Sequence, residues 1–195
     1  MFDKKIIYID CGGHVGQTIQ RFQKITRSMV NAEIHSFEPH PRLYPIIKKY
    51  SNENTFVYDK AVWKEDGYVD FYLDNLDEVE GSGWEHPGQG STTSKNKTTG
   101  TLDRKHPHRA ESIDLNRWII ENFNKDDFIH VKLDIEGGEY DVLPNMIKGG
   151  SIDYIDEFDI EFHSHKIGLD EKVHDDLLNE LRTATKGRNI NVRTH

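Results

Sequence analysis

Acidic residues gather around two glycines in the segment 130–143, and their types and spacing suit chemistry. Asp134, Glu136 and Glu139 follow an apolar run there. Acids crowded near a pocket raise one another's pKa, which suits them to accept a proton or to bind a metal ion. The alternative, which fits Glu139 at least in part, is a helix N-terminus that carries acids to match its dipole. Asp134 and Glu136 are therefore the first candidates for a general base or a metal ligand.

A glycine turn follows the first apolar run of the chain. Asp10 ends that run, and Gly12, Gly13 and Gly16 come shortly after it. Glycines in such a place let a ligand approach backbone N–H groups at the start of a helix. The turn therefore predicts a nucleotide-like or amino-acid-like ligand. It departs from the dinucleotide pattern G-x-G-x-x-G, because Val15 stands where the second glycine is needed.

Glu38 ends a second apolar run and is followed by Pro39. An acid at the end of a strand can accept two hydrogen bonds from ribose hydroxyls. An acid at the end of a strand is about as often simply exposed to solvent as it is part of a ligand site. Its position becomes specific beside the glycine turn, and the two features together favour a ligand that contains ribose.

Alternating strands and helices must position these residues. Strands are predicted at 4–10, 33–38, 55–58, 68–73, 128–135, 154–162 and 189–193. Helices are predicted at 17–30, 43–50, 112–123, 139–146 and 171–184. This order favours an α/β fold, a Rossmann-like, doubly wound and mostly parallel sheet with helices on both faces, because parallel neighbours need crossover helices. Ligands of such sheets bind at the carboxyl ends of the strands.

Composition favours a single globular domain. The chain has 195 residues, of which 35% are hydrophobic and 30% are charged, enough to bury a core. The formal net charge of −9 argues against a nucleic-acid partner, and the short basic stretch 104–109 is expected to be a loop. Cys11 is the only cysteine, so no intramolecular disulfide can form. Without a signal peptide or an apolar stretch of ~20 residues, we expect a cytoplasmic protein with no membrane partner.

Gly, Ser, Thr, Asn, Lys, Pro and His dominate residues 81–108, where Trp84 is the one Trp, Tyr or Phe. A long stretch of this kind inside a compact domain is usually a functional lid or is disordered. We expect a flexible loop or a lid over an acceptor, with Trp84 available to stack on a sugar.

Three segments resemble the FkbM-type methyltransferases, a branch of the class I S-adenosylmethionine-dependent fold, in order and spacing. They are 10–16, 36–39 and 132–139, and the resemblance covers about 6–163. It implies an S-adenosylmethionine-dependent O-methyltransferase whose acceptor is a small molecule or a glycan, often a sugar hydroxyl. Family members usually end in an antiparallel strand pair, for which this chain has too few residues, so a domain cut from a larger polypeptide is expected.

The resemblance also implies roles for single residues. Glu38 would bind the ribose with Pro39 beside it, and Ala61 and Val62 would lie near the adenine. Asp10, Gly12, Gly13 and Gly16 would hold the methionine portion of the cofactor. Asp134 and Glu136 would lie beside the transferred methyl group.

Two routes to a reactive hydroxyl stay open. In the first, Asp134 or Glu136 takes the proton directly. In the second, Asp134, Glu161 and His163 bind a divalent cation, Mg²⁺ or Mn²⁺, that lowers the pKa of the hydroxyl. Glu161 and His163 end the strand expected beside the one that leads to Asp134, so their convergence is geometrically reasonable. The other histidines are expected to be solvated.

Two further classes of function compete with methyl transfer. One is an oxidoreductase on the same sheet that binds NAD or a nucleotide sugar, and the missing second glycine argues against it. The other is a non-catalytic interaction domain that keeps only the fold. Retention of the glycine turn, Glu38 and the acidic cluster argues against this second class.

Overall fold

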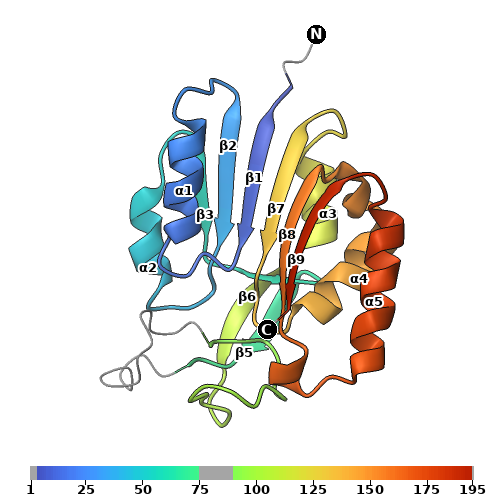
Figure 1. Cartoon of the computed structure of the whole chain (residues 1–195). Coiled ribbons are helices and arrows are strands. Elements are labelled where there is room, and N and C mark those ends of the chain that lie inside the picture. Colours follow the sequence, from blue (N-terminus) through green and yellow to red (C-terminus); the bar gives the residue numbers. More distant parts are fainter. Residues whose placement is uncertain (1–3, 75–89, 195) are drawn as a thin grey trace.

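The computed structural model describes residues 4–74 and 90–194, and its centre is a six-stranded sheet. The strand order is β3-β2-β1-β7-β8-β9, and every neighbouring pair is parallel. The strands are β1 (Ile6–Cys11), β2 (Ala32–Phe37), β3 (Thr55–Tyr58), β7 (Phe128–Leu133), β8 (Glu157–Phe162) and β9 (Asn189–Thr194). All their carboxyl ends meet at one edge (Figure 1). The predicted parallel, doubly wound sheet is confirmed.

Helices cover both faces of the central sheet (Figure 1). They are α1 (Gln17–Thr26), α2 (Tyr44–Ile47), α3 (Leu115–Asn122), α4 (Glu139–Gly149) and α5 (Glu171–Ala184). Within the described ranges, no helix combines the length and the apolar character that a membrane span requires.

Side chains along β1 point alternately to the two faces of the sheet, and this explains why helices pack on both faces. Ile7 and Ile9 are fully buried and pack in one large core with the apolar sides of α3, α4 and α5. Tyr8 points to the opposite face, where its ring lies 4.3 Å from that of Phe22 on α1. Side chains of a strand alternate between the two faces of its sheet, so a single buried strand anchors both helical layers.

A second, three-stranded sheet lies below the carboxyl ends of the central one (Figure 1). Its order is β4-β6-β5, with β4 (Ala61–Trp63) parallel and β5 (Gly67–Phe71) antiparallel to β6 (His108–Asp114). The prediction of a helix from residue 112 was wrong at its start, as was a loop at 108–109. The strand continues to Asp114, because it pairs with strands on both sides, and α3 begins only there.

Other elements differ from prediction mainly at their ends. The helix predicted over 43–50 is a short α2 followed by a 3₁₀ turn, Lys48–Tyr50. The strand predicted from residue 154 begins at Glu157, because Ser151–Tyr154 forms another 3₁₀ turn. The helix predicted over 171–184 has those bounds in the structure.

The predicted lid segment 81–108 is described from residue 90 onward, and its part 81–89, which includes Trp84, lies outside the described residues. Thr92 bridges to Tyr72, and Leu102 bridges to Asp74. Thr92 is fully buried. The described part therefore packs on the body of the protein beside the carboxyl ends of the strands.

Candidate functional site

A cavity of about 800 Å³, counted with its open mouth, lies at the carboxyl ends of β1, β2 and β7. The predicted site residues that line it are Gly12, Gly13, Glu38, Pro39, Ala61, Val62, Asp134 and Glu136. The structure thus brings together most of the residues assigned to cofactor binding.

The glycine turn forms one wall of this cavity. Gly12 has a φ of +97°, and a Cβ there would overlap the carbonyl oxygen of Asp134. The backbone N–H groups of Gly12 and Gly13 donate to the carbonyl oxygen of Phe37 at 3.1 and 2.9 Å. Only glycine combines this backbone conformation with so close an approach of two chain segments.

Glu38 fastens the turn to the end of β2. One carboxylate oxygen accepts the N–H of His14 at 2.7 Å, and the other accepts the N–H of His40 at 2.8 Å. Burial raises the pKa of Glu38 to about 7, although both backbone hydrogen bonds lower it. Each oxygen of a carboxylate has lone pairs for more than one donor, so Glu38 can also accept a ligand hydroxyl in the cavity.

Asp10 lies behind the cavity wall. The strand register places it between Ser36 of β2 and Lys132 of β7. It is fully buried, accepts a hydrogen bond from Ser36 Oγ at 2.9 Å, and lies 3.4 Å from Lys132 Nζ. Asp10 therefore acts on the cavity indirectly, through its contacts with Ser36 and Lys132.

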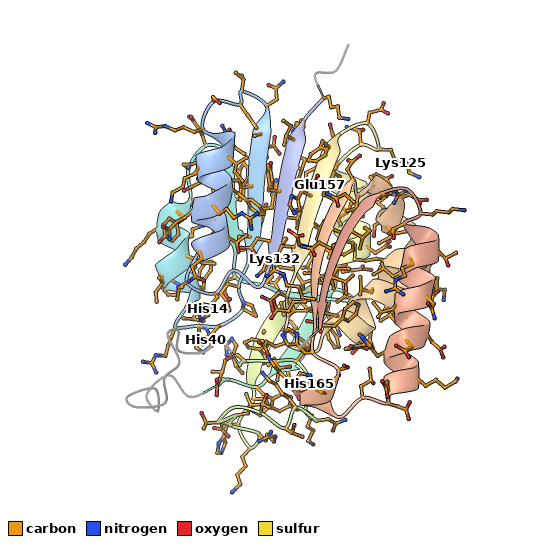
Figure 2. The ribbon with its side chains drawn as sticks, viewed as in Figure 1. His14, His40, Lys125, Lys132, Glu157 and His165 are labelled. Atoms are coloured by element: carbon orange, nitrogen blue, oxygen red, sulfur yellow. The ribbon has the colours of Figure 1, made fainter. Side chains whose placement is uncertain are left out.

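Lys132 links the two acids and the glycine turn. Its Nζ donates to the carbonyl oxygen of Gly12 at 3.0 Å and lies 3.2 Å from Asp134 Oδ2. Burial would lower the pKa of Lys132, but the charges of Asp10 and Asp134 outweigh burial and raise it. Figure 2 shows Lys132 in the middle of the sheet, close to its carboxyl edge. A role for Lys132 in the site was not predicted, although this residue begins the segment 132–139 that contains Asp134.

Gly16 also lies outside the cavity lining. It is the N-cap of α1 with a φ of 89°, and a Cβ there would lie 2.5 Å from the ring of Tyr50. Its role is to let α1 begin close to the 3₁₀ turn after α2. Among the residues expected to hold the methionine portion, Gly12 and Gly13 line the cavity while Asp10 and Gly16 support it.

Glu136 is a buried carboxylate held by two lysines. Its Oε2 lies 2.6 Å from Nζ of the buried Lys97 and 3.3 Å from Nζ of Lys166. Lys97 also donates to the carbonyl oxygen of Gly90. Burial lowers the pKa of Lys97, although the charge of Glu136 acts in the opposite direction. The backbone of Glu136 has a φ of 55°, which is strained for a residue other than glycine.

His163 is fully buried at the end of β8 and points its Nε2 atom toward acids. That atom lies 3.8 Å from Asp134 Oδ1, 3.6 Å from Glu136 Oε1 and 3.5 Å from Glu161 Oε1. Among the described residues, Nε2 has no hydrogen-bond partner. Burial lowers the pKa of His163, but the hydrogen bond and charge of Glu139 and the charge of Glu136 raise it overall.

Glu139 does more than match a helix dipole. It stands in the first turn of α4, as the alternative from sequence expected, but it is fully buried. Its Oε1 accepts from the backbone N–H of Ile135 and lies 3.1 Å from His163 Nδ1, while Oε2 accepts from Gly137 N–H. Glu139 therefore fixes both the turn after β7 and the orientation of the imidazole.

Glu161 lines a second cavity, of about 700 Å³ with its open mouth, between α1 and β7, β8 and β9. Lys132 and Asp134 line both cavities. Within the described part of the chain, a group with metal-binding geometry is formed by Asp134, Glu136 and His163, whereas the predicted set contained Glu161 in place of Glu136. His163 and Glu161 do not line the first cavity.

Several lining residues were not predicted. The first cavity is also lined by Phe71 of β5 and by Ser91 and Thr93, which lie in the segment between β5 and β6. Ser91 and Thr93 fall in the segment 81–108 that was expected to be a flexible loop or a lid, but neither was singled out. Phe71 carried no signal, because its approach depends on the pairing of β5 with β6.

Comparison with known proteins gives one family. Residues 10–187 match the model described as the methyltransferase FkbM domain. No curated protein and no solved structure matches the sequence. The matched range contains all the site residues named above.

Proposed function

The chain belongs to the FkbM methyltransferase family, and on this premise we propose that it is an S-adenosylmethionine-dependent O-methyltransferase. The acceptor we propose is a hydroxyl of a sugar, in a glycan or in a glycosylated small molecule. The observation that carries the proposal is a single cavity that combines the Gly12-Gly13 turn, the Glu38 carboxylate and the acids after β7.

The lining of the cavity fits the parts of the cofactor. Glu38 presents a carboxylate to ribose hydroxyls, and Ala61 and Val62 offer an apolar wall for the adenine. The backbone of Gly12 and Gly13 lines the part of the cavity left for the methionine portion. S-adenosylmethionine would supply an electrophilic methyl group beside Asp134 and Glu136.

The hydrogen bonds of the glycine turn favour this cofactor over a dinucleotide. A pyrophosphate is bound by free backbone N–H groups at such a turn. The N–H groups of Gly12 and Gly13 donate to Phe37, that of His14 to Glu38, and that of Gly16 to Gly13. These four donors are already used within the protein, which argues against an NAD-dependent oxidoreductase.

Residues on the cavity wall would orient the acceptor and take up its proton. S-adenosylmethionine would supply the methyl group to the hydroxyl oxygen in line, with its own sulfur as the leaving group, and Asp134 or Glu136 would take the proton that the hydroxyl loses. Burial would raise the pKa of Asp134, but the charges of Lys132 and His163 lower it overall. Asp134 therefore stays ionised and can orient the hydroxyl, with Glu136 beside it.

We also propose that a divalent cation, Mg²⁺ or Mn²⁺, assists the reaction. A cation beside the acceptor oxygen would lower the pKa of the hydroxyl. An unpartnered, buried His163 Nε2 next to three acids supports this proposal.

Product analysis tests the function. The purified chain is incubated with S-adenosylmethionine, Mn²⁺ and a panel of free and glycosidic sugars, and products are detected by mass spectrometry. We expect a singly methylated sugar together with S-adenosylhomocysteine, and loss of both in Glu38→Gln. The matched control is Glu157→Gln, an acid far from the carboxyl edge (Figure 2). Cofactor binding with no methylated product from any sugar would contradict the proposed acceptor class.

A further inference from the structure

Three side chains at the carboxyl ends of neighbouring strands bring potential ligand atoms together. Asp134 follows β7, Glu136 lies in the turn after it, and His163 follows β8. One ligand atom from each lies within 4.8 Å of those of the other two. Ligands of one ion with bonds of about 2.1 Å lie roughly 3 to 4 Å apart. Small side-chain movements would therefore place all three on one cation.

His163 Nε2 supplies an independent indication of a ligand. The side chain is fully buried, and this atom has no hydrogen-bond partner among the described residues. A buried polar atom without a partner costs free energy. A cation located between Nε2 and the facing oxygens of Asp134 and Glu136 would remove that cost.

Glu139 orients the imidazole of His163 so that Nε2 can bind a cation. Both oxygens of Glu139 accept backbone N–H groups, Oε1 from Ile135 and Oε2 from Gly137. The carboxylate is therefore an acceptor on both sides, and its 3.1 Å contact with His163 places a proton on Nδ1. In the neutral ring this leaves the Nε2 lone pair directed at the acids. Histidines that bind metals commonly donate their other N–H to a carboxylate or a carbonyl oxygen.

The lysines leave one oxygen of Glu136 facing the imidazole. Lys97 Nζ contacts Oε2 at 2.6 Å, and Oε1 is the atom that lies 3.6 Å from His163 Nε2. Lys166 contacts both oxygens less closely, at 3.3 and 3.5 Å. The strained backbone at Glu136, with a φ of 55°, is the kind of cost that persists where a side chain must be placed for function.

We propose that Asp134, Glu136 and His163 bind a divalent cation and that Glu139 is the positioning residue for the imidazole. The set differs from the sequence-based one, because Glu136 takes the place of Glu161. Two carboxylates favour Mg²⁺ or Mn²⁺, and the imidazole makes Mn²⁺ the better fit of the two. Binding of the ion stands on this geometry alone, whereas its effect on the acceptor hydroxyl rests on the proposed function.

Electron paramagnetic resonance of Mn²⁺ added to the full chain, without S-adenosylmethionine, tests the site. The free-ion signal should decrease until a single Mn²⁺ ion is bound per chain. Glu136→Gln and His163→Ala should each abolish saturable binding. Glu139→Gln should weaken it about 10- to 100-fold, the range seen when an outer carboxylate is removed. Circular dichroism and titration with S-adenosylmethionine show that each variant is folded.

Glu161→Gln distinguishes the two ligand sets. This variant should bind Mn²⁺ as the unmodified chain does. Loss of binding in Glu161→Gln with retention in Glu136→Gln would overturn the proposal in favour of the sequence-based set. No saturable binding to the unmodified chain, with S-adenosylmethionine binding intact, would overturn the cation site alone. Mn²⁺ binding without binding of S-adenosylmethionine would instead contradict the proposed function and leave the site standing.

Discussion

Glu38 holds the glycine turn with both carboxylate oxygens while it faces the cavity. Its burial raises the pKa to about 7, from an ordinary value of 4.5. The native state therefore keeps a proton that the unfolded chain loses between these values. The stabilising contribution of this group is complete below pH 4.5 and is lost as the pH rises through 7.

Binding of S-adenosylmethionine should depend on pH through Glu38. The ionised carboxylate accepts two hydrogen bonds from ribose, and the protonated form loses part of that capacity. A pKa of about 7 makes the affinity weaker at pH 6 than at pH 8, by up to about tenfold. Burial lowers the pKa of His40 to about 4, so this neighbour stays neutral over the range. Calorimetric titration at both pH values measures the change, which Glu38→Gln should remove; a flat profile in the unmodified chain would contradict the assignment.

His163→Ala should lower methyl transfer without weakening cofactor binding. His163 touches the acidic cluster but does not line the first cavity. Loss of a group that activates a hydroxyl costs about 10² or more in kcat, while Kd for S-adenosylmethionine should stay the same. His106→Ala, an exposed histidine, serves as the control for kcat and Kd. Normal turnover in His163→Ala would remove His163 from the mechanism.

Single site residues were predicted best where an acidic residue stands at the end of a predicted strand. Glu38 and Asp134 follow buried strands and line the cavity as expected. Glu139 was interpreted partly as a dipole-matching acid, because its contact with His163 joins segments 24 residues apart. Lys97 had no signal at all, since it lies in a polar segment and is buried by contacts made only in the fold.

The turn between β1 and α1 depends on Gly12. Gly12→Ala should cost several kcal/mol of unfolding free energy and abolish cofactor binding, because its Cβ would overlap the Asp134 carbonyl. Gly187→Ala is the control, with a φ of 85° and open space around a Cβ, and should cost only about 1–2 kcal/mol. Urea denaturation of the two variants measures the difference. Equal costs would show that the close approach at Gly12 is not required.

The segment after β5 is fastened by the ion pair between Lys97 and Glu136. Lys97→Met should cost about 3–5 kcal/mol, because it leaves a buried carboxylate with one partner fewer. Lys97→Met combined with Glu136→Gln should recover much of that stability without recovering activity. Lys60→Met breaks a more exposed pair with Glu111 and should cost under about 1 kcal/mol. Urea denaturation measures the unfolding free energy of each variant. If the losses caused by Lys97→Met and Glu136→Gln simply add in the double variant, Lys97 and Glu136 are not energetically coupled.

Elements of the central sheet could be predicted because each carries its own pattern. The run before Asp10 is apolar and buried on both faces of the sheet, as parallel strands are, whereas the run before Asp134 alternates buried and half-buried residues. Of the second sheet only β5 was predicted, as a strand at 68–73. Its other two strands were missed, because β4 is only three residues long and β6 carries polar residues next to a long polar segment. Long-range pairing, which has no signature within either strand, decides its structure.

At the scale of the whole molecule, one edge of the sheet collects the chemistry. The loops after β1 and β2 carry His14 and His40, and the loop after β8 carries His165, all at the same edge as Lys132 (Figure 2). The carboxyl ends of parallel strands meet there by topology. Location of the site was therefore predictable from the strand order. For the segment 90–107 the composition left a lid and a disordered loop as alternatives and gave no indication of the contacts by which it packs on the protein.

Isothermal titration of the full chain with S-adenosylmethionine, S-adenosylhomocysteine and NAD, each with and without Mn²⁺, tests the central claim most directly. The account predicts that both sulfur ligands bind one site with Kd on the order of 10⁻⁶ M, about −8 kcal/mol, and that NAD does not bind. Both affinities should fall in Glu38→Gln. Binding of NAD without binding of either sulfur ligand would contradict the account and assign the cavity to a dinucleotide.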